Sequence, residues 1–154
     1  MTVVAIVGLI VAMSIPNFLR VRIDTEQVTA QKALKTVSAA LESYRFVQVP
    51  PTYPSDLSLL ANANPPYLTQ QLVLSADANV PGSGIGTTFY LKSRGYRIGY
   101  MPNTALGNRI IDYILYAIPY EHSQNNNRAK TYRLDAGGYL IETNADQVPI
   151  KFLN

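Results

Sequence analysis

The chain contains no cysteine and no tryptophan, and it has a single histidine among its 154 residues. Without cysteine there is neither a disulfide framework nor a thiolate ligand for a metal. The histidine, His122, lies in a polar stretch, and the carboxylates are too scattered to nominate a catalytic pair. No nucleophile–base pair and no zinc site can be assembled from the usual side chains. We therefore expect a protein that is not an enzyme and that uses no cofactor or metal.

Charge is also scarce in this sequence. Charged residues make up 15% of the chain, whereas soluble domains average about 25%. The net charge of +3 arises from 13 basic and 10 acidic residues, without a basic block of the kind that binds phosphates. Nucleic acid is therefore not expected as a main partner. The length fits one domain.

The chain opens on a long apolar run. Val3 to Met13 has no polar side chain, and the first charge is Arg20. The uncharged residues from Met1 to Leu19 would form about 28 Å of helix, just short of the roughly 30 Å hydrocarbon core of a bilayer. Three interpretations compete: a cleaved signal peptide, a buried core helix, or an anchor whose first residues are absent from this chain. The first lacks its basic region and its cleavage site.

The helical pattern does not stop after this run. Val21 and Val28 lead into an apolar stripe with the spacing of one helix face, and Pro50-Pro51 ends it. The opposite face carries Lys32, Lys35, Ser38, Glu42 and Arg45. The stripe that we expect to pack on the rest of the protein consists of Ala33, Leu34, Val37, Ala40, Leu41 and Tyr44. A small soluble domain has no use for so long a helix with one apolar end, which favours the anchor.

Two residues weaken the apolar half of this helix. Pro16 removes a backbone hydrogen bond and clashes with a carbonyl, at a cost of about 3 kcal/mol in a helix interior. Gly8 adds about 1 kcal/mol relative to alanine. The stretch between Gly8 and Pro16 is therefore where we predict that the helix unwinds or kinks.

The segment "VVAIVGLIVAMSIPNFLRVR" resembles the N-terminus of type IV pilins and of the pseudopilins of type II secretion. The family's I-P-N-F motif reads Ile15-Pro16-Asn17-Phe18 here. Aligned on it, the family's methylated first residue and its glutamate would precede Met1, so we expect an N-terminally truncated chain. The resemblance implies processing by a prepilin peptidase. Residues expected to serve assembly and helix melting are Gly8, Ser14, Pro16, Asn17 and Phe18.

Prolines follow the helix and enforce extended backbone. Ser55 is the expected N-cap of a short helical turn over Asp56–Leu60. The arrangement of Tyr53, Pro54 and Leu57 is similar to a turn found in pilins and pseudopilins. Residues 61–88 are predicted to be loop.

Strand signals fill the last third of the chain. Gly95–Pro102 alternates in polarity, and Asp112–Pro119 is apolar on both faces, as expected of a central strand. Lys130–Thr143 is predicted to be a hairpin around Asp135-Ala136-Gly137-Gly138. Three or four antiparallel strands need a cover for their apolar face, and the helix stripe can supply it. We expect an α+β fold in which a long N-terminal helix packs on this sheet, in the manner of a pilin.

These expectations divide the chain into an anchor and filament-core helix (1–24), an amphipathic helix on the head (25–48) and a globular head (49–154). By resemblance, the chain is a structural subunit of a type IV pilus filament. The resemblance implies that it is held in the bacterial inner membrane and then assembled with copies of itself by pilus machinery into an extracellular pilus. One alternative is a pseudopilin in a periplasmic pseudopilus, although the late acids lack the clustered spacing of the calcium loop usual there. Another is a membrane-anchored periplasmic binding domain that never polymerises.

Overall fold

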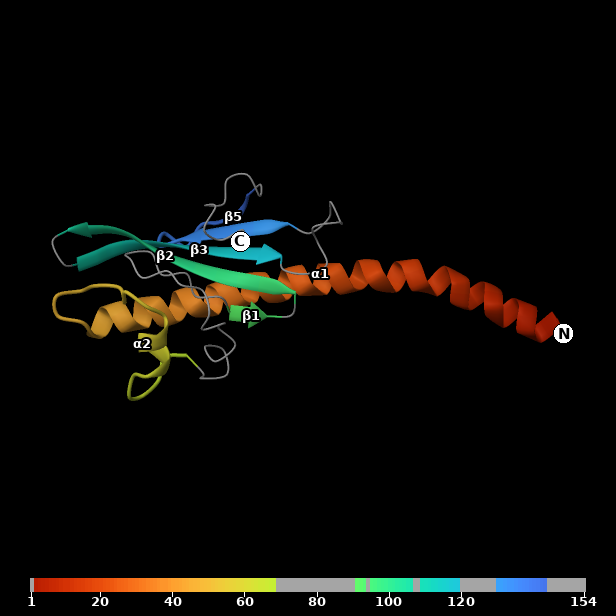
Figure 1. Cartoon of the computed structure of the whole chain (residues 1–154), viewed down its shortest axis with the longest axis horizontal. Helices are drawn as coiled ribbons and strands as arrows, with labels where there is room; N and C mark the ends of the chain where they lie inside the picture. Colours follow the sequence, from red (N-terminus) through yellow and green to blue (C-terminus); the bar gives the residue numbers. More distant parts are fainter. Residues whose placement is uncertain (1, 69–90, 94, 107–108, 120–129, 144–154) are drawn as a thin grey trace, which may run out of the picture.

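The protein is described as a computed structural model, which defines the backbone of residues 2–68, 91–93, 95–106, 109–119 and 130–143. Side chains are described at residues 3, 21–68, 95–103, 109–119 and 130–143. One long helix, α1 (Thr2–Val47), runs beside a sheet and continues well past it toward the N-terminus (Figure 1). The fold is α+β, as predicted.

Helix α1 is unbroken through Gly8 and Pro16 and curves gently in the part that lies beyond the sheet (Figure 1). Its 46 residues correspond to a length of about 69 Å. It ends at Val47, before the extended backbone that Pro50 and Pro51 impose. The predicted unwinding between Gly8 and Pro16 concerns a packed filament and stays a prediction.

Within the described residues, the sheet has five antiparallel strands in the order β1-β2-β3-β4-β5, so each strand pairs with its neighbours in sequence. The strands are β1 (Leu91–Ser93), β2 (Tyr96–Leu106), β3 (Arg109–Pro119), β4 (Thr131–Asp135) and β5 (Leu140–Thr143). The predicted strands are found as β2 to β5, and the short strand β1 is an addition that was not predicted. Three residues, among them Lys92 and Ser93, are too few for an alternation pattern to stand out.

Strand β3 lies at the centre of the sheet, between β2 and β4, which confirms the prediction made from its two apolar faces. Strand β2 does not end at Pro102 but continues to Leu106. Among the residues that the structure describes, β1 pairs with β2 only from Tyr96 to Ile98, and Pro102 lies beyond this pairing, opposite Tyr113 of β3.

The predicted β4–β5 hairpin is confirmed. The backbone N–H of Gly138 donates to the carbonyl of Asp135 at 2.9 Å, and Gly138 has a positive φ of 79° that favours glycine. The Asp135 carboxylate also accepts from the backbone N–H of Tyr139 at 3.1 Å. This turn fixes the register that places Leu134 opposite Leu140.

Helix α2 (Ser58–Ala61) is shorter and later than the predicted turn. Ser55 is not its N-cap: Leu57 holds that position and makes no side-chain cap. The carboxylate of Asp56 instead accepts the backbone N–H of Ser58 at 2.6 Å. An aspartate competes well with serine for free N–H groups at a helix start, which explains the shift.

The core lies between α1 and one face of the sheet. Helix α1 contributes Ala30, Leu34, Val37 and Leu41, and the segment around α2 closes one side with Leu57 and Leu60. The sheet contributes alternate residues of β2, β3 and β4, which are Tyr96, Ile98, Tyr100, Tyr113, Leu115, Ala117, Tyr132 and Leu134. Four of these eight are tyrosines, so the packing also has to provide partners for buried hydroxyl groups.

Candidate assembly helix and its junction with the head

The predicted head-packing stripe lies in the core. Leu34, Val37, Ala40 and Leu41 are buried, and the half-buried Ala33 and Tyr44 pack against the same cluster. Sequence reasoning missed Ala30, which is fully buried one turn before Leu34. Alanine occurs on either face of a helix, so its residue type does not predict burial. Its spacing of four residues from Leu34 places it on the same helix face and could have indicated burial.

The residues predicted for assembly, namely Gly8, Ser14, Pro16, Asn17 and Phe18, all lie on the helical backbone of α1 beyond the sheet. Their side chains fall outside the described residues, as do His122 and Asn125–Asn127. Across the part of the chain that is described, no helix is long and apolar enough to span a bilayer. Within that same part, no three acidic or histidine side chains cluster as metal ligands would.

Three residues assigned to the solvent face of α1 instead face the head. Ser38 shares a hydrogen bond of 2.9 Å with the Tyr113 hydroxyl. The Tyr53 hydroxyl donates to the Glu42 carboxylate at 2.6 Å and accepts from the Arg45 guanidinium at 3.0 Å. The assignment failed because these positions lie on the flanks of the buried stripe, within reach of polar groups on the head.

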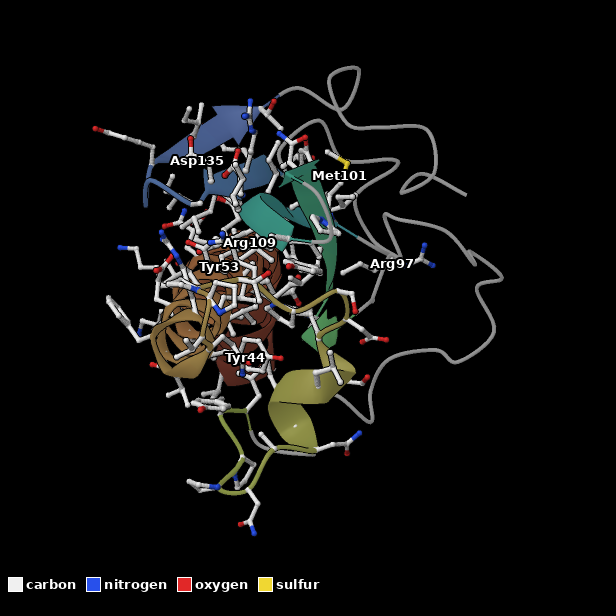
Figure 2. The ribbon with its side chains drawn as sticks, turned by 90° about the vertical axis from the view of Figure 1, so that its left-hand side faces the viewer. Tyr44, Tyr53, Arg97, Met101, Arg109 and Asp135 are labelled. Carbon is white, nitrogen blue, oxygen red and sulfur yellow. The ribbon has the colours of Figure 1, made fainter. Side chains whose placement is uncertain are left out.

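Glu42, Arg45 and Tyr53 therefore form a polar contact between α1 and the segment that follows it, which we call the polar lock. The Arg45 guanidinium also lies over the Tyr53 ring, 5.1 Å from the centroid. The ring itself packs edge-to-face on Tyr113, with centroids 4.8 Å apart. In Figure 2, Tyr53 lies between α1 and the sheet, and Tyr44 lies on the side of α1 that faces α2. The lock joins the end of the helix to the centre of the sheet.

A second chain of contacts fixes the other strands. The buried Tyr100 hydroxyl donates to the Pro54 carbonyl at 2.6 Å. The Tyr96 hydroxyl donates to the Lys130 carbonyl at 3.0 Å, and the Tyr132 hydroxyl donates to the Gln27 side-chain oxygen at 3.2 Å. These hydrogen bonds give partners to tyrosine hydroxyls that would be unpaired in a purely apolar core.

Burial, together with the hydrogen bond to Glu42, raises the pKa of Tyr53 to about 12, against the lowering effect of the Arg45 guanidinium. Burial also raises the pKa values of Tyr96, Tyr100 and Tyr113. A raised folded-state pKa means that the folded head holds these protons more tightly than the unfolded chain does. The stability that they contribute is complete below about pH 10 and is lost as the pH rises through the folded values.

We expect the urea midpoint of the full chain in mild detergent to fall steeply between pH 10 and pH 12. Tyr53→Phe should make the fall of the urea midpoint with pH less steep, because phenylalanine has no hydroxyl proton whose pKa folding can raise. Near-ultraviolet circular dichroism reports the transition, since the chain has tyrosines and no tryptophan. Tyr139→Phe, at an exposed ring, is the matched control. An alkaline slope unchanged by Tyr53→Phe would contradict the linkage.

The turn between β1 and β2 approaches α1 closely. Gly95 has a φ of 88°, and a Cβ placed there would lie 2.9 Å from the Glu26 carboxylate. Glu26 is held in place by Arg22, whose Nε lies 3.0 Å from it. The site thus marks the level at which the sheet stops covering the helix (Figure 1).

Gly95→Ala should destabilise the head more than Gly138→Ala does. Both substitutions place a side chain at positive φ, which costs roughly 1 kcal/mol, but a Cβ at Gly138 meets nothing within 4 Å. The excess at Gly95 measures the displacement of Glu26 and should vanish in a Glu26→Ala background. Urea unfolding of the four variants tests this, and equal losses at both glycines would show that the close approach is unimportant.

Comparisons with models of known protein families, with curated proteins and with solved structures found no match to this chain.

Proposed function

We propose that this chain is a structural subunit of a type IV pilus filament and assembles through its N-terminal helix. The observation that carries the proposal is the division of α1. From Ala30 onward its buried face packs on the head, whereas its N-terminal half extends past the sheet (Figure 1). That N-terminal half has the apolar sequence with the Ile15-Pro16-Asn17-Phe18 motif.

The two halves of α1 have different roles in this proposal. The half on the head needs the sheet to bury its leucines and contributes to a stable unit. The other half is held in the inner membrane until assembly and then packs with copies of itself in the filament core. The same symmetry operation relates each subunit to the next, and because it does not close on itself it produces an open helical assembly rather than a ring. The prepilin peptidase and the pilus assembly machinery are its proposed partners.

Pro16 and Gly8 have a role in the transfer from membrane to filament. A helix that is weak between these residues yields locally when its neighbours in the filament impose a different packing. The cost of the proline, about 3 kcal/mol in an intact helix, is then partly recovered by unwinding.

The test replaces both residues in the full-length gene of the native host. Wild-type protein should be found in filaments sheared from the cell surface, and Gly8→Ala/Pro16→Ala protein should remain largely in the membrane fraction. Pro66→Ala, at an exposed position of the head, is the control and should assemble normally. Filaments confined to the periplasm would favour the pseudopilin. If the protein never enters filaments and its cellular role is unaffected by the double substitution, a non-polymerising binding domain is the better explanation.

A further inference from the structure

The face of the sheet that points away from α1 carries a second apolar cluster, which we call the outer cluster. It consists of Met101, Ile114, Tyr116 and Ile118, and in Figure 2 Met101 lies on the side of the sheet away from the helix. Tyr116 and Ile118 are only 5% and 7% exposed. Both described helices contribute to the core on the opposite face, so neither accounts for this burial. Side chains stand upright on a sheet, and their neighbours in the sheet leave their tops open. The cover therefore comes from another part of the protein.

Arg133 lies beside the outer cluster and has a buried polar atom without a partner. It pairs with Tyr116 on β3 and with Ile141 on β5. Its Nε–H is buried and donates no hydrogen bond to any residue that the structure describes. A buried N–H group of a charged side chain is costly to leave without an acceptor. The cover of the outer cluster should therefore also bring an acceptor to Arg133, and a carboxylate is the strongest one.

The chain leaves the sheet next to this site. Thr143 is the last residue of β5, is itself buried, and pairs with Thr131, two residues before Arg133 on β4. Two residues along a strand span about 7 Å, and the three residues from Thr143 to Asp146 span about 10 Å when extended. A chain that turns back over the sheet after Thr143 can therefore bring the Asp146 carboxylate to Arg133.

Residues 144–154, which lie outside the described residues, have the composition that such a cover needs. Asp146 is their only acidic residue. Their larger apolar residues are Val148, Ile150, Phe152 and Leu153. Extended, these eleven residues reach about 36 Å. The crossing from β5 to β2 covers three strand spacings, or about 14 Å. The segment is therefore long enough to place apolar side chains over the outer cluster.

Two other segments outside the described residues fit this site less well. Residues 120–129 have Tyr120 and Ala129 as their only apolar residues, so they have little apolar surface to place on the cluster. Residues 69–90 follow Leu68, which is buried in the core on the α1 side, and lead into β1. Strand β1 is separated from β4 and Arg133 by two strands. Neither segment combines apolar residues with a starting point beside Arg133.

We propose that residues 144–154 pack across the outer cluster of their own chain and that the Asp146 carboxylate accepts a hydrogen bond from the Arg133 Nε–H. The occupant is a segment of the same chain, because it starts beside the site and closes a short loop to reach it. The contact hides an apolar face that would otherwise be open to association with other proteins. The inference concerns the head alone and does not depend on the proposed filament.

The absence of native cysteine allows the cover to be tested by labelling one introduced thiol. The full chain in mild detergent carries Met101→Cys within the outer cluster, and its rate of reaction with a maleimide is measured. Ile150→Asp/Phe152→Asp should raise this rate several-fold, because carboxylates do not stay on an apolar face. Ile150→Ala/Phe152→Ala, a milder change, should raise it less. Ile150→Leu/Phe152→Leu, which keeps apolar side chains, is the matched control and should label at the parent rate.

A labelling rate that neither the aspartate nor the alanine pair raises would overturn the proposal, because the cover would then come from elsewhere. The measurement is repeated at much lower protein concentration. A cover from the same chain keeps its protection on dilution, whereas loss of protection would mean that a second copy supplies the cover. That result would also overturn the proposal.

Arg133→Gln and Asp146→Asn test the proposed acceptor in a double-mutant cycle on the urea midpoint. Each single change should lower the midpoint, and the double change should lower it little more than either one, because the second finds no partner to lose. Asp77→Asn and Glu121→Gln, at acids of the two other segments, are the controls and should each add independently to Arg133→Gln. Additive effects of Arg133→Gln and Asp146→Asn, or coupling with either control, would contradict the assignment of Asp146.

Discussion

Replacing Tyr113 with alanine is expected to lower the free energy of unfolding of the head by about 4 kcal/mol, the range found for large aromatic-to-alanine changes in cores. Tyr113 is fully buried on the central strand β3 and touches both layers of the fold. Its ring packs on Tyr53 and lies 6.1 Å from the ring of Tyr100, and its hydroxyl bonds Ser38 of α1. Alanine would leave a cavity at the point where the polar lock meets the sheet.

Tyr113→Phe separates packing from hydrogen bonding at this position. It keeps the ring and removes the bond to Ser38, so the loss should be about 1 kcal/mol. Urea unfolding of the full chain in mild detergent, followed by near-ultraviolet circular dichroism, measures both variants against the wild type. If phenylalanine costs as much as alanine, the hydroxyl and not the ring holds the helix to the sheet, and our description of the core is wrong.

Leu34→Ala is expected to destabilise the head by about 3 kcal/mol, because it removes a fully buried side chain from the middle of the helix stripe. Lys35→Ala, at the next position on the exposed side, should change stability by less than about 0.5 kcal/mol. The same urea experiment tests the pair. Equal effects would mean that the stripe is not the surface by which α1 holds the sheet.

Leu34→Ala also has a consequence for assembly. A head loosened on α1 leaves the polar lock without support, so we expect less protein in sheared filaments and more proteolysis of the head. Lys35→Ala should match the wild type in both measurements. A destabilised Leu34→Ala chain that assembles at wild-type level would show that the head tolerates loss of its contact with α1.

The fold was predictable where the sequence is periodic. The stripe from Ala33 to Tyr44, the apolar β3 and the glycine-bearing turn after Asp135 each carry a signal that is local in the chain. Strand β1 was not predictable, because three residues show no period. The start of α2 was misplaced because Ser55 and Asp56 are adjacent and equally suited to accept a free N–H group there, and it is Asp56 that does so.

The polar lock was not predictable for a different reason. Glu42 and Arg45 are residue types common on any solvated helix face, and Tyr53 lies in a stretch whose prolines predict a loop. Their bonds depend on the position in space of a segment that folds back along α1 after Val47. The exposure of Val28 and Phe46 was not predictable for the same reason, since both look like core residues until the sheet is seen to cover the other side of the helix.

The most direct test of the central claim is a three-dimensional reconstruction, by electron cryomicroscopy, of filaments sheared from the native host. Our account predicts filaments built from this chain, with the N-terminal halves of α1 bundled along the axis, the backbone loosened between Gly8 and Pro16, and the heads outside. Filaments that lack this chain, or that contain it with α1 outside the core, would contradict the account.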